Sequence, residues 1–414
     1  MRSIGFELVF LGLFAATVSA CSSGSSEDAG ADDRGSVPDG GSDGGPKDVE
    51  GVEAGQGDAE SLDGSQRPDV RVDAGRDVDS GGVNLDSGVD GGILLDAATA
   101  DATADAGPLS AERYFPPSAW MYQDISSAAL STDSDVVTQW LSDNGGFGLG
   151  RIQIDFSIEV LTADGSPRQT FEPTGDFYDP DCDRVLMPLP AGGALEGESG
   201  YECTSDGDCH LIVVDRAAGR LYEMWRANVT GGTFYGGCAV LWDLTRTYPA
   251  EGRGEQCTSA DAAGFPIAPL LFSADEVAAG HIDHAIRFIL PNARMRRGYY
   301  VRPASHAGGP SGPGQAPVYG TRWRLRADYP LETLPNDAAR VVARALQQYG
   351  MALADGGNVA LTAQSDRFTT HSWAEVGLEP RDLAAIQPTD FEVIDTGAPI
   401  ELTFDCMRTP ISEF

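Results

Sequence analysis

The first quarter of this 414-residue chain cannot contribute a hydrophobic core. Residues 22–107 contain no Phe, Trp, Tyr, His or Cys, and they carry 21 acidic residues, 5 basic residues and 18 glycines. Such a segment buries too little apolar surface to offset the conformational entropy lost on ordering it. The sequence therefore predicts a disordered acidic linker within 21–108 and places the folded part of the chain in 109–414, as a single domain.

The N-terminal segment has the layout of an export signal. Arg2 precedes an apolar stretch over 4–18, which is too short for a stable membrane span and is followed by small residues. The sequence Val-Ser-Ala-Cys at 18–21 resembles the lipobox of bacterial lipoproteins, whose signal is cleaved before an acylated cysteine. The resemblance implies a signal peptide over 1–20, lipidation of Cys21 and anchoring to a bacterial membrane at the cell envelope or surface. Ordinary cleavage after Ala20, without lipidation, is the alternative.

The folded part contains an even number of cysteines, which in an exported protein predicts disulfides. Two of them flank the turn-rich stretch Thr-Ser-Asp-Gly-Asp and could close a small loop. Zinc binding is the alternative, but no paired C-x-x-C spacing supports it, and we predict no metal and no other cofactor. The six residues are Cys182, Cys203, Cys209, Cys238, Cys257 and Cys406.

Period-two patterns dominate the folded part. In 151–160, apolar and polar side chains alternate, which predicts a half-buried antiparallel strand. Residues 210–215 and 220–226 predict a hairpin. Further strands are expected near 184–189, 238–244, 284–290, 298–302, 320–328, 358–363 and 391–395.

Few helices are expected. The clearest begins at its N-cap Asn336 and runs to Tyr349, before Gly350, and shorter helices are expected near 134–142 and 274–279. Many short strands with few helices favour a mainly β fold. We predict an antiparallel β-sandwich or jelly-roll-like domain with helical additions.

Four stretches carry a family resemblance. They are His-Leu-Ile-Val-Val-Asp at 210–215 with Leu-Tyr-Glu at 221–223, Thr-Ser-Ala-Asp-Ala-Ala-Gly at 258–264, Asp-Glu-Val-Ala-Ala-Gly at 275–280, and Tyr-Gly-Met-Ala-Leu-Ala-Asp at 349–355. Together they resemble a group of secreted bacterial proteins, often attached to carbohydrate-binding modules, whose reaction is not established. The resemblance covers about 115–397 and implies an extracellular domain that meets polysaccharide, but it implies no mechanism.

Three carboxylates are candidate catalytic groups. Glu223 shares a strand face with apolar neighbours, which would raise its pKa as a general acid requires; pairing with an arginine is the alternative. Asp261 lies in a loop of small residues that a substrate can approach, or it caps a turn. Asp355 precedes two glycines and is either a functional or a turn residue. Two of these carboxyl groups facing each other across a cleft would act as acid and base on a glycosidic bond.

Histidines supply a fourth catalytic candidate. His284 opens an otherwise apolar strand face, as His210 does, and His306 enters a loop rich in Gly and Pro. A structural hydrogen bond is the alternative for each of them. The spacings match no metal-binding motif.

An arginine-rich segment interrupts an acidic chain. The formal net charge of −35 disfavours nucleic acid as a partner. Residues 287–326, however, hold eight arginines and no Asp, Glu or Lys. Arginines alternate along 322–326, which predicts one charged strand face that binds an anionic polysaccharide. Pairing with the domain's own acids, or protection of a sheet edge, is the alternative. The predicted substrate-binding residues are Arg302, His306, Arg322, Trp323, Arg324 and Arg326.

Three hypotheses about the function follow. The first is a lipid-anchored surface enzyme, a hydrolase or lyase, that cleaves polysaccharide with carboxylates near Glu223 and Asp261. The second is a lipoprotein that binds glycan or the cell envelope without catalysis. A purely structural envelope lipoprotein is a third reading.

Overall fold

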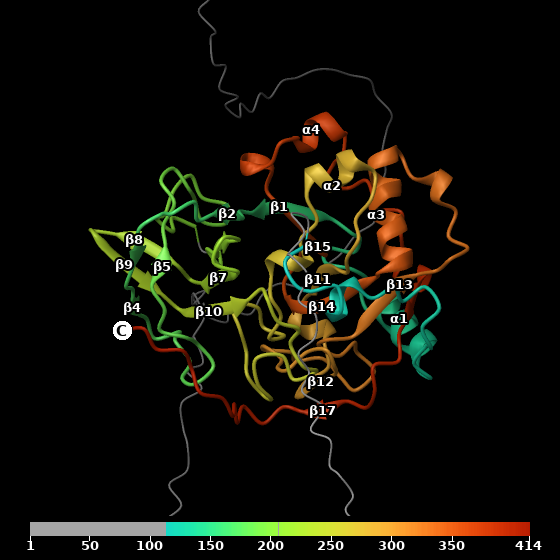
Figure 1. The fold of residues 1–414 in the computed structure, drawn as a ribbon. Coiled ribbons are helices and arrows are strands. Elements are labelled where there is room, and N and C mark those ends of the chain that lie inside the picture. The colour runs from blue at the N-terminus through green and yellow to red at the C-terminus, as the bar shows by residue number, and fades with distance from the viewer. Residues whose placement is uncertain (1–112, 206) are drawn as a thin grey trace, which may run out of the picture. The chain divides into compact units, whose positions relative to one another are not determined.

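The computed structural model describes residues 113–205 and 207–414 (Figure 1). The expected signal peptide, the lipidation at Cys21 and the whole predicted acidic linker lie outside these residues. The described residues belong to one compact unit. Within them, no helix combines the length and the apolar character needed to cross a membrane.

The larger sheet has six strands of mixed direction. β1 pairs with β15 in parallel, as β11 does with β14, whereas β13 runs antiparallel to both of its neighbours. Helix α3 packs on β13 and α1 packs on β16, while Figure 1 shows α2 beside α3. The strands are, in spatial order, β1 (Ile154–Ile158), β15 (Leu361–Gln364), β11 (Ile286–Leu290), β14 (Met351–Gly356), β13 (Arg322–Leu325) and β16 (Phe391–Val393). The three helices are α1 (Ser134–Asp143), α2 (Ala274–Ala279) and α3 (Asp337–Gln348).

A second sheet of four strands is buried on both faces. One face of β7, carrying Leu221, joins the core of the larger sheet, and the other, carrying Tyr222 and Met224, joins a separate apolar cluster. The predicted hairpin is confirmed, because β6 and β7 pair antiparallel and Asp215 stands opposite Arg220. The strands are, in order, β10 (Cys238–Asp243), β7 (Arg220–Trp225), β6 (Leu211–Asp215) and β2 (Leu161–Thr162).

Short elements complete the described fold. The small sheets pair β12 (Tyr299–Tyr300) with β17 (Ile400–Glu401), β3 (Arg168–Gln169) with β5 (Met187–Pro188), and β9 (Thr233–Gly236) with both β4 (Glu172–Pro173) and β8 (Asn228–Thr230). Helix α4 spans Trp373–Val376, and the 3₁₀ helices span Trp120–Tyr122, Ala268–Leu270, Asn292–Arg294, Leu331–Thr333, Asp366–Phe368 and Pro388–Asp390.

The predicted helices are confirmed, and α3 begins and ends as its sequence indicates. The Asn336 side chain accepts a hydrogen bond from the Ala339 backbone N–H at 2.7 Å, which satisfies a donor of the first turn. Gly350 follows the last turn with φ +69°, and a Cβ there would collide with the Trp323 carbonyl. Glycine is therefore required where the chain turns from α3 into β14.

All six cysteines of the folded part form disulfides, as predicted. The pairs are Cys182–Cys238, Cys203–Cys209 and Cys257–Cys406. Three disulfides are typical of a protein that folds outside the cytoplasm. The third pair ties the loop that precedes Asp261 to the C-terminal segment, which Asp183 also holds through Arg408 at 2.7 Å.

The described domain has more strand than helix, but the expected antiparallel sandwich is not confirmed. The strand predicted over 151–160 is shorter, and β1 is parallel to its partner β15. Alternation of side chains indicates which face is buried and carries no information on the direction of the partner strand. β14 was not predicted, because its sequence Met-Ala-Leu-Ala-Asp-Gly lacks the β-branched and aromatic residues that favour strands.

Candidate functional site

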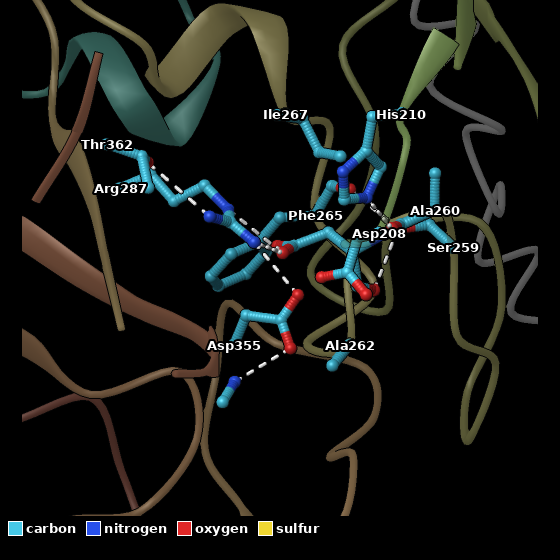
Figure 2. A network of polar contacts seen from close by, with 12 residues as sticks. Asp208, His210, Ser259, Ala260, Ala262, Phe265, Ile267, Arg287, Asp355 and Thr362 are labelled. Atoms are coloured by element: carbon cyan, nitrogen blue, oxygen red, sulfur yellow. Dashed lines mark hydrogen bonds and ion pairs between the residues drawn. The ribbon is translucent and has the colours of Figure 1, made fainter. Parts of the chain in front are cut away.

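Asp261 and Asp355 meet at one buried guanidinium group, that of Arg287. Figure 2 shows Arg287 with Asp355 and Thr362. The Nη2 of Arg287 donates to Oδ1 of Asp261 at 2.7 Å and to Oδ2 of Asp355 at 2.9 Å. Its Nε donates to Asp261 at 3.0 Å, and its Nη1 donates to the Thr362 hydroxyl at 3.4 Å. Two of the four predicted catalytic residues therefore share one arginine.

A register shift places Asp355 beside Arg287. Along the parallel pair of β11 and β14, Arg287 stands opposite Ala352. Beyond the shift, Ile289 stands opposite Asp355, so Ala354 is the extra residue of a bulge. Because side chains alternate between faces, the extra residue moves Asp355 onto the face that carries Arg287.

Asp261 combines the two roles that its sequence context allows. Its backbone closes a turn, because Gly264 donates to its carbonyl at 2.9 Å and its own N–H donates to the Ser259 hydroxyl at 3.0 Å. Its side chain is fully buried and reaches Arg287 through Oδ1. Its Oδ2 is buried without a hydrogen-bond partner.

Burial and charge decide the proton content of the pair. Burial raises the pKa of Asp261 to about 8, because Arg287 only partly offsets it and the Asp355 charge adds to it. Burial also raises the pKa of Asp355, against the effect of Arg287. Like charges held this close do not both ionise readily. At neutral pH we therefore assign the shared proton to Asp261, and the Asp355 side chain, 20% exposed, is the member of the pair that solvent reaches.

His210 joins the network from the start of β6. Its Nδ1 lies 2.6 Å from a carboxylate oxygen of Glu196, and its Nε2 lies 3.1 Å from the Ala260 carbonyl oxygen. Burial opposes the charge on His210, but Glu196 outweighs it and raises the pKa to about 9. Asp208, from the loop closed by the Cys203–Cys209 disulfide, adds negative charge on this side and raises the pKa of both His210 and Asp355. Figure 2 shows Asp208 between these two residues.

Glu223 is enclosed by protein donors. Its Oε1 accepts from the backbone N–H groups of Ile267 and Ala268 at 2.8 and 2.9 Å, and its Oε2 accepts from Nε1 of Trp242 at 2.9 Å. Burial raises its pKa to about 7, in the predicted direction, although these hydrogen bonds oppose the shift. The side chain is fully buried, and its contacts attach the segment after the Asp261 loop to β7.

Of the other two histidine candidates, one contacts the Asp261 loop and one does not. His284 binds the Ala285 carbonyl at 2.8 Å and a carboxylate oxygen of Glu276 at 3.1 Å. His306 is buried, and its Nδ1 lies 2.9 Å from the Ala262 carbonyl. His306 therefore touches the Asp261 loop from behind, whereas His284 has no direct contact with Arg287 or the two aspartates.

The predicted charged strand face is not an open surface, because β13 is buried on both sides. Arg322 donates to the Tyr349 carbonyl at 2.6 Å, and Arg324 pairs with Glu392 at 2.6 Å. Arg326 and Arg302 are paired as well. Trp323 is fully buried in the aromatic core and has no face free to stack on a sugar. Pairing with the domain's own groups, the alternative reading of this segment, describes these arginines. Arg326 pairs with Glu392 and Asp135, and Arg302 pairs with Glu255.

Two clusters of acidic and cysteine side chains occur within the described residues. Each contains a disulfide pair, so its sulfur atoms are not thiolates able to bind a metal. The clusters are Asp181 with Cys257 and Cys406, and Glu198 with Cys203 and Cys209.

Sequence reasoning did not select the residues that join the site. In the sequence, Arg287 is only the first member of the arginine-rich segment, and His210 is only a histidine at the start of an apolar strand face. No sequence pattern marks Glu196 or Asp208 as a site residue, because each joins the site only through contacts with residues that are distant in the sequence or on another element. Comparisons with protein-family models, curated proteins and solved structures gave no match to this chain. The function is therefore argued from the geometry of the site.

Proposed function

We propose that this domain is a glycoside hydrolase that acts on polysaccharide outside the cytoplasm, with Asp355 and Asp261 as its carboxyl pair. The observation that carries the proposal is that the carboxyl groups of Asp261 and Asp355 both accept a hydrogen bond from Nη2 of Arg287. Contacts of 2.7 and 2.9 Å to one nitrogen hold the two carboxyl groups close together. The two contacting oxygen atoms can be no further apart than the sum of these two distances, and this limit includes the spacing of about 5–5.5 Å found in retaining glycosidases.

The environments of the two carboxyl groups divide their roles. Asp355 is ionised beside Arg287 and is reached by solvent, so it is the group that attacks the anomeric carbon. Asp261 holds the proton, and its Oδ2 is the one oxygen of the pair without a protein partner. Because this oxygen is buried, the loop of small residues around Asp261 has to move aside when substrate binds. As the glycosidic bond breaks, the leaving oxygen then takes this proton. Water then cleaves the glycosyl ester on Asp355, and Asp261 takes the proton of that water.

The location completes the proposal. The three disulfides support a site of action outside the cytoplasm. A lipid on Cys21, with the acidic linker as spacer, would hold the enzyme at the cell envelope or surface. Hydrolysis is favoured over a lyase reaction, because Arg322 and Arg324, expected to neutralise a uronate, bind groups of the protein itself.

A small hollow favours glycan binding without catalysis as the second candidate. Its walls include the partly exposed rings of Trp120 and Tyr248, with Trp242 and Phe265 behind them. Arg322 lies over the Trp120 ring at 5.4 Å from its centroid, and Arg246 lies over the Tyr248 ring at 4.6 Å. A sugar bound here would therefore contact the exposed parts of these rings beside the two arginines. This hollow and the loop of Asp261 are continuous in sequence through Gly264 and Phe265.

The test is a screen of the full chain against neutral and uronate polysaccharides, with release of reducing ends and binding both measured. Asp355→Asn should lower kcat by at least about 100-fold, because it removes the ionised carboxylate. Asp337→Asn is the matched control, since Asp337 is an exposed carboxylate on α3, and it should leave kcat unchanged. Binding without product release in the wild type, or full activity of Asp355→Asn, would contradict the hydrolase and favour the binding module.

A further inference from the structure

Both ring nitrogens of His210 face atoms that accept hydrogen bonds and cannot donate them. Nδ1 lies 2.6 Å from the Glu196 carboxylate, and Nε2 lies 3.1 Å from the Ala260 carbonyl. A neutral imidazole has one N–H and can donate to only one of the two. The contacts therefore require the doubly protonated, cationic ring.

We infer that His210, as an imidazolium ion, is a positioning residue for Asp261. It donates to the carbonyl of Ala260, the residue directly before Asp261, and so fixes the loop that delivers the Asp261 carboxyl group to Arg287. This inference rests on the proposed function, because it gives His210 a role in the reaction assigned to Asp261 and Asp355.

The ring is held from a rigid part of the fold. The chain around His210 and Glu196 is joined by further bonds, since the Glu196 N–H donates to the His210 carbonyl at 3.0 Å. His210 follows Cys209, whose disulfide closes the adjacent loop, and it precedes β6 in the buried sheet. Figure 2 shows the ring pointing from this strand toward Ala260. A disulfide and a sheet thus support the histidine, which in turn supports the catalytic loop.

The charges around the ring come from every neighbouring element. Glu196 and Asp208 favour the imidazolium ion, whereas Arg287 on β11 opposes it. The ring charge in turn lowers the pKa of Asp261, of Asp355 on β14 and of Glu223 on β7. Loss of the ring proton therefore breaks one of its two hydrogen bonds and also strengthens the hold of both aspartates on protons.

The test compares wild type with His210→Gln and Glu196→Gln, and uses His284→Gln as the matched control. His284 is also buried between a carbonyl and a carboxylate but has no contact with the two aspartates. In wild type at pH 7.5, nitrogen NMR of the ring should show both nitrogens of His210 protonated. Glu196→Gln should lower the pH of the His210 titration by about one unit or more, because it removes the facing negative charge.

Activity provides the second readout. His210→Gln should lower kcat by up to about 100-fold with little change in KM, because Asp261 is displaced while substrate contacts remain. In Glu196→Gln, the part of the alkaline fall in kcat that follows loss of the His210 ring proton should move to lower pH together with the His210 titration, while the pKa of Asp261 moves to higher pH. His284→Gln should change neither quantity.

The outcomes separate the two claims. If wild type cleaves no polysaccharide, the proposed function fails. Carbon NMR of the Asp261 carboxyl group still tests the inference about His210. In His210→Gln, the titration of Asp261 should move to higher pH than in wild type. A His210 ring with one protonated nitrogen at pH 7.5 would overturn the inference. So would an Asp261 titration that stays in place in His210→Gln.

Discussion

Replacement of Arg287 by methionine is expected to lower the free energy of unfolding by about 3–5 kcal/mol, because it leaves buried acidic groups without their cation. Arg287 is itself almost completely buried and donates to two carboxyl groups and a hydroxyl. Methionine fills part of its volume, so most of the loss is electrostatic. Chemical denaturation at pH 7 measures the effect.

The control for this substitution is Arg340→Met. Arg340 pairs with Asp337 three residues earlier on α3, where the Asp337 side chain is 96% exposed. An ion pair with such an exposed partner contributes about 0–1 kcal/mol, and the hydrogen bonds from Arg340 to the carbonyls of Leu331 and Leu334 add about 1 kcal/mol each. The double variant Arg287→Met/Asp355→Asn should cost less than the sum of its parts, because neutralising Asp355 removes the charge left unpaired. Equal losses in Arg287→Met and Arg340→Met would contradict the central place given to Arg287.

The second large effect is expected from the disulfide that holds the C-terminal segment. Removal of Cys257–Cys406 by paired serine substitutions should destabilise the folded protein by about 5 kcal/mol on the chain-entropy account. Removal of Cys203–Cys209 should cost only about 2 kcal/mol on the same account. The reason is loop length, since the cysteines are 149 positions apart in the first pair and 6 in the second.

Denaturant unfolding of the two paired variants under identical conditions measures this difference. Each variant is the control for the other, because both replace two buried or partly buried sulfur atoms. The Cys257–Cys406 variant should also become sensitive to proteolysis in the C-terminal segment, which the remaining contacts of Asp183 hold less firmly. A larger loss in the short-loop variant would show that local contacts, and not loop closure, determine the effect.

Local features of the fold were predictable from the sequence, and pairings between distant strands were not. The hairpin of β6 and β7, the start of α3 at Asn336 and the small loop closed by Cys203 and Cys209 each depend on residues that carry their own signal. The sequence predicted that the other four cysteines form disulfides, but it did not predict their partners. The parallel pairing of β1 with β15 depends on which strands meet, and alternation in one strand does not encode that. The same alternation in 322–326 predicted an exposed charged face, but β13 is covered on both sides and its arginines pair internally.

The sequence indicated the two acidic residues of the candidate site, but it did not indicate the contacts that bring them together. Asp261 stood out because small residues surround it, and Asp355 because glycines follow it. Their meeting at Arg287 depends on the bulge at Ala354, a single extra residue that no spacing pattern announces. Glu223 shows the converse: its apolar surroundings correctly indicated a raised pKa, but three protein donors surround the group.

In the proposed mechanism, Asp261 keeps its proton beside Arg287 while Asp355 is ionised. The folded-state pKa of Asp261, raised by burial to about 8, lies above the value of about 3.9 for an unfolded chain. Between these values the folded state binds a proton that the unfolded state releases, so this group makes the free energy of unfolding fall as pH rises from about 4 to about 8. Asparagine resembles the protonated acid, since its oxygen can accept from Arg287 and its NH₂ replaces the protonated Oδ2.

The most direct test is the free energy of unfolding of wild type and Asp261→Asn at pH 5, 7 and 9. His210 and Glu223 titrate in both proteins, so the difference between the two curves isolates Asp261. We expect the variant to match wild type within about 1 kcal/mol at pH 5 and to be the more stable protein at pH 9. A variant that is destabilised by several kcal/mol at every pH would instead show an ionised Asp261, and would contradict the assignment of the shared proton.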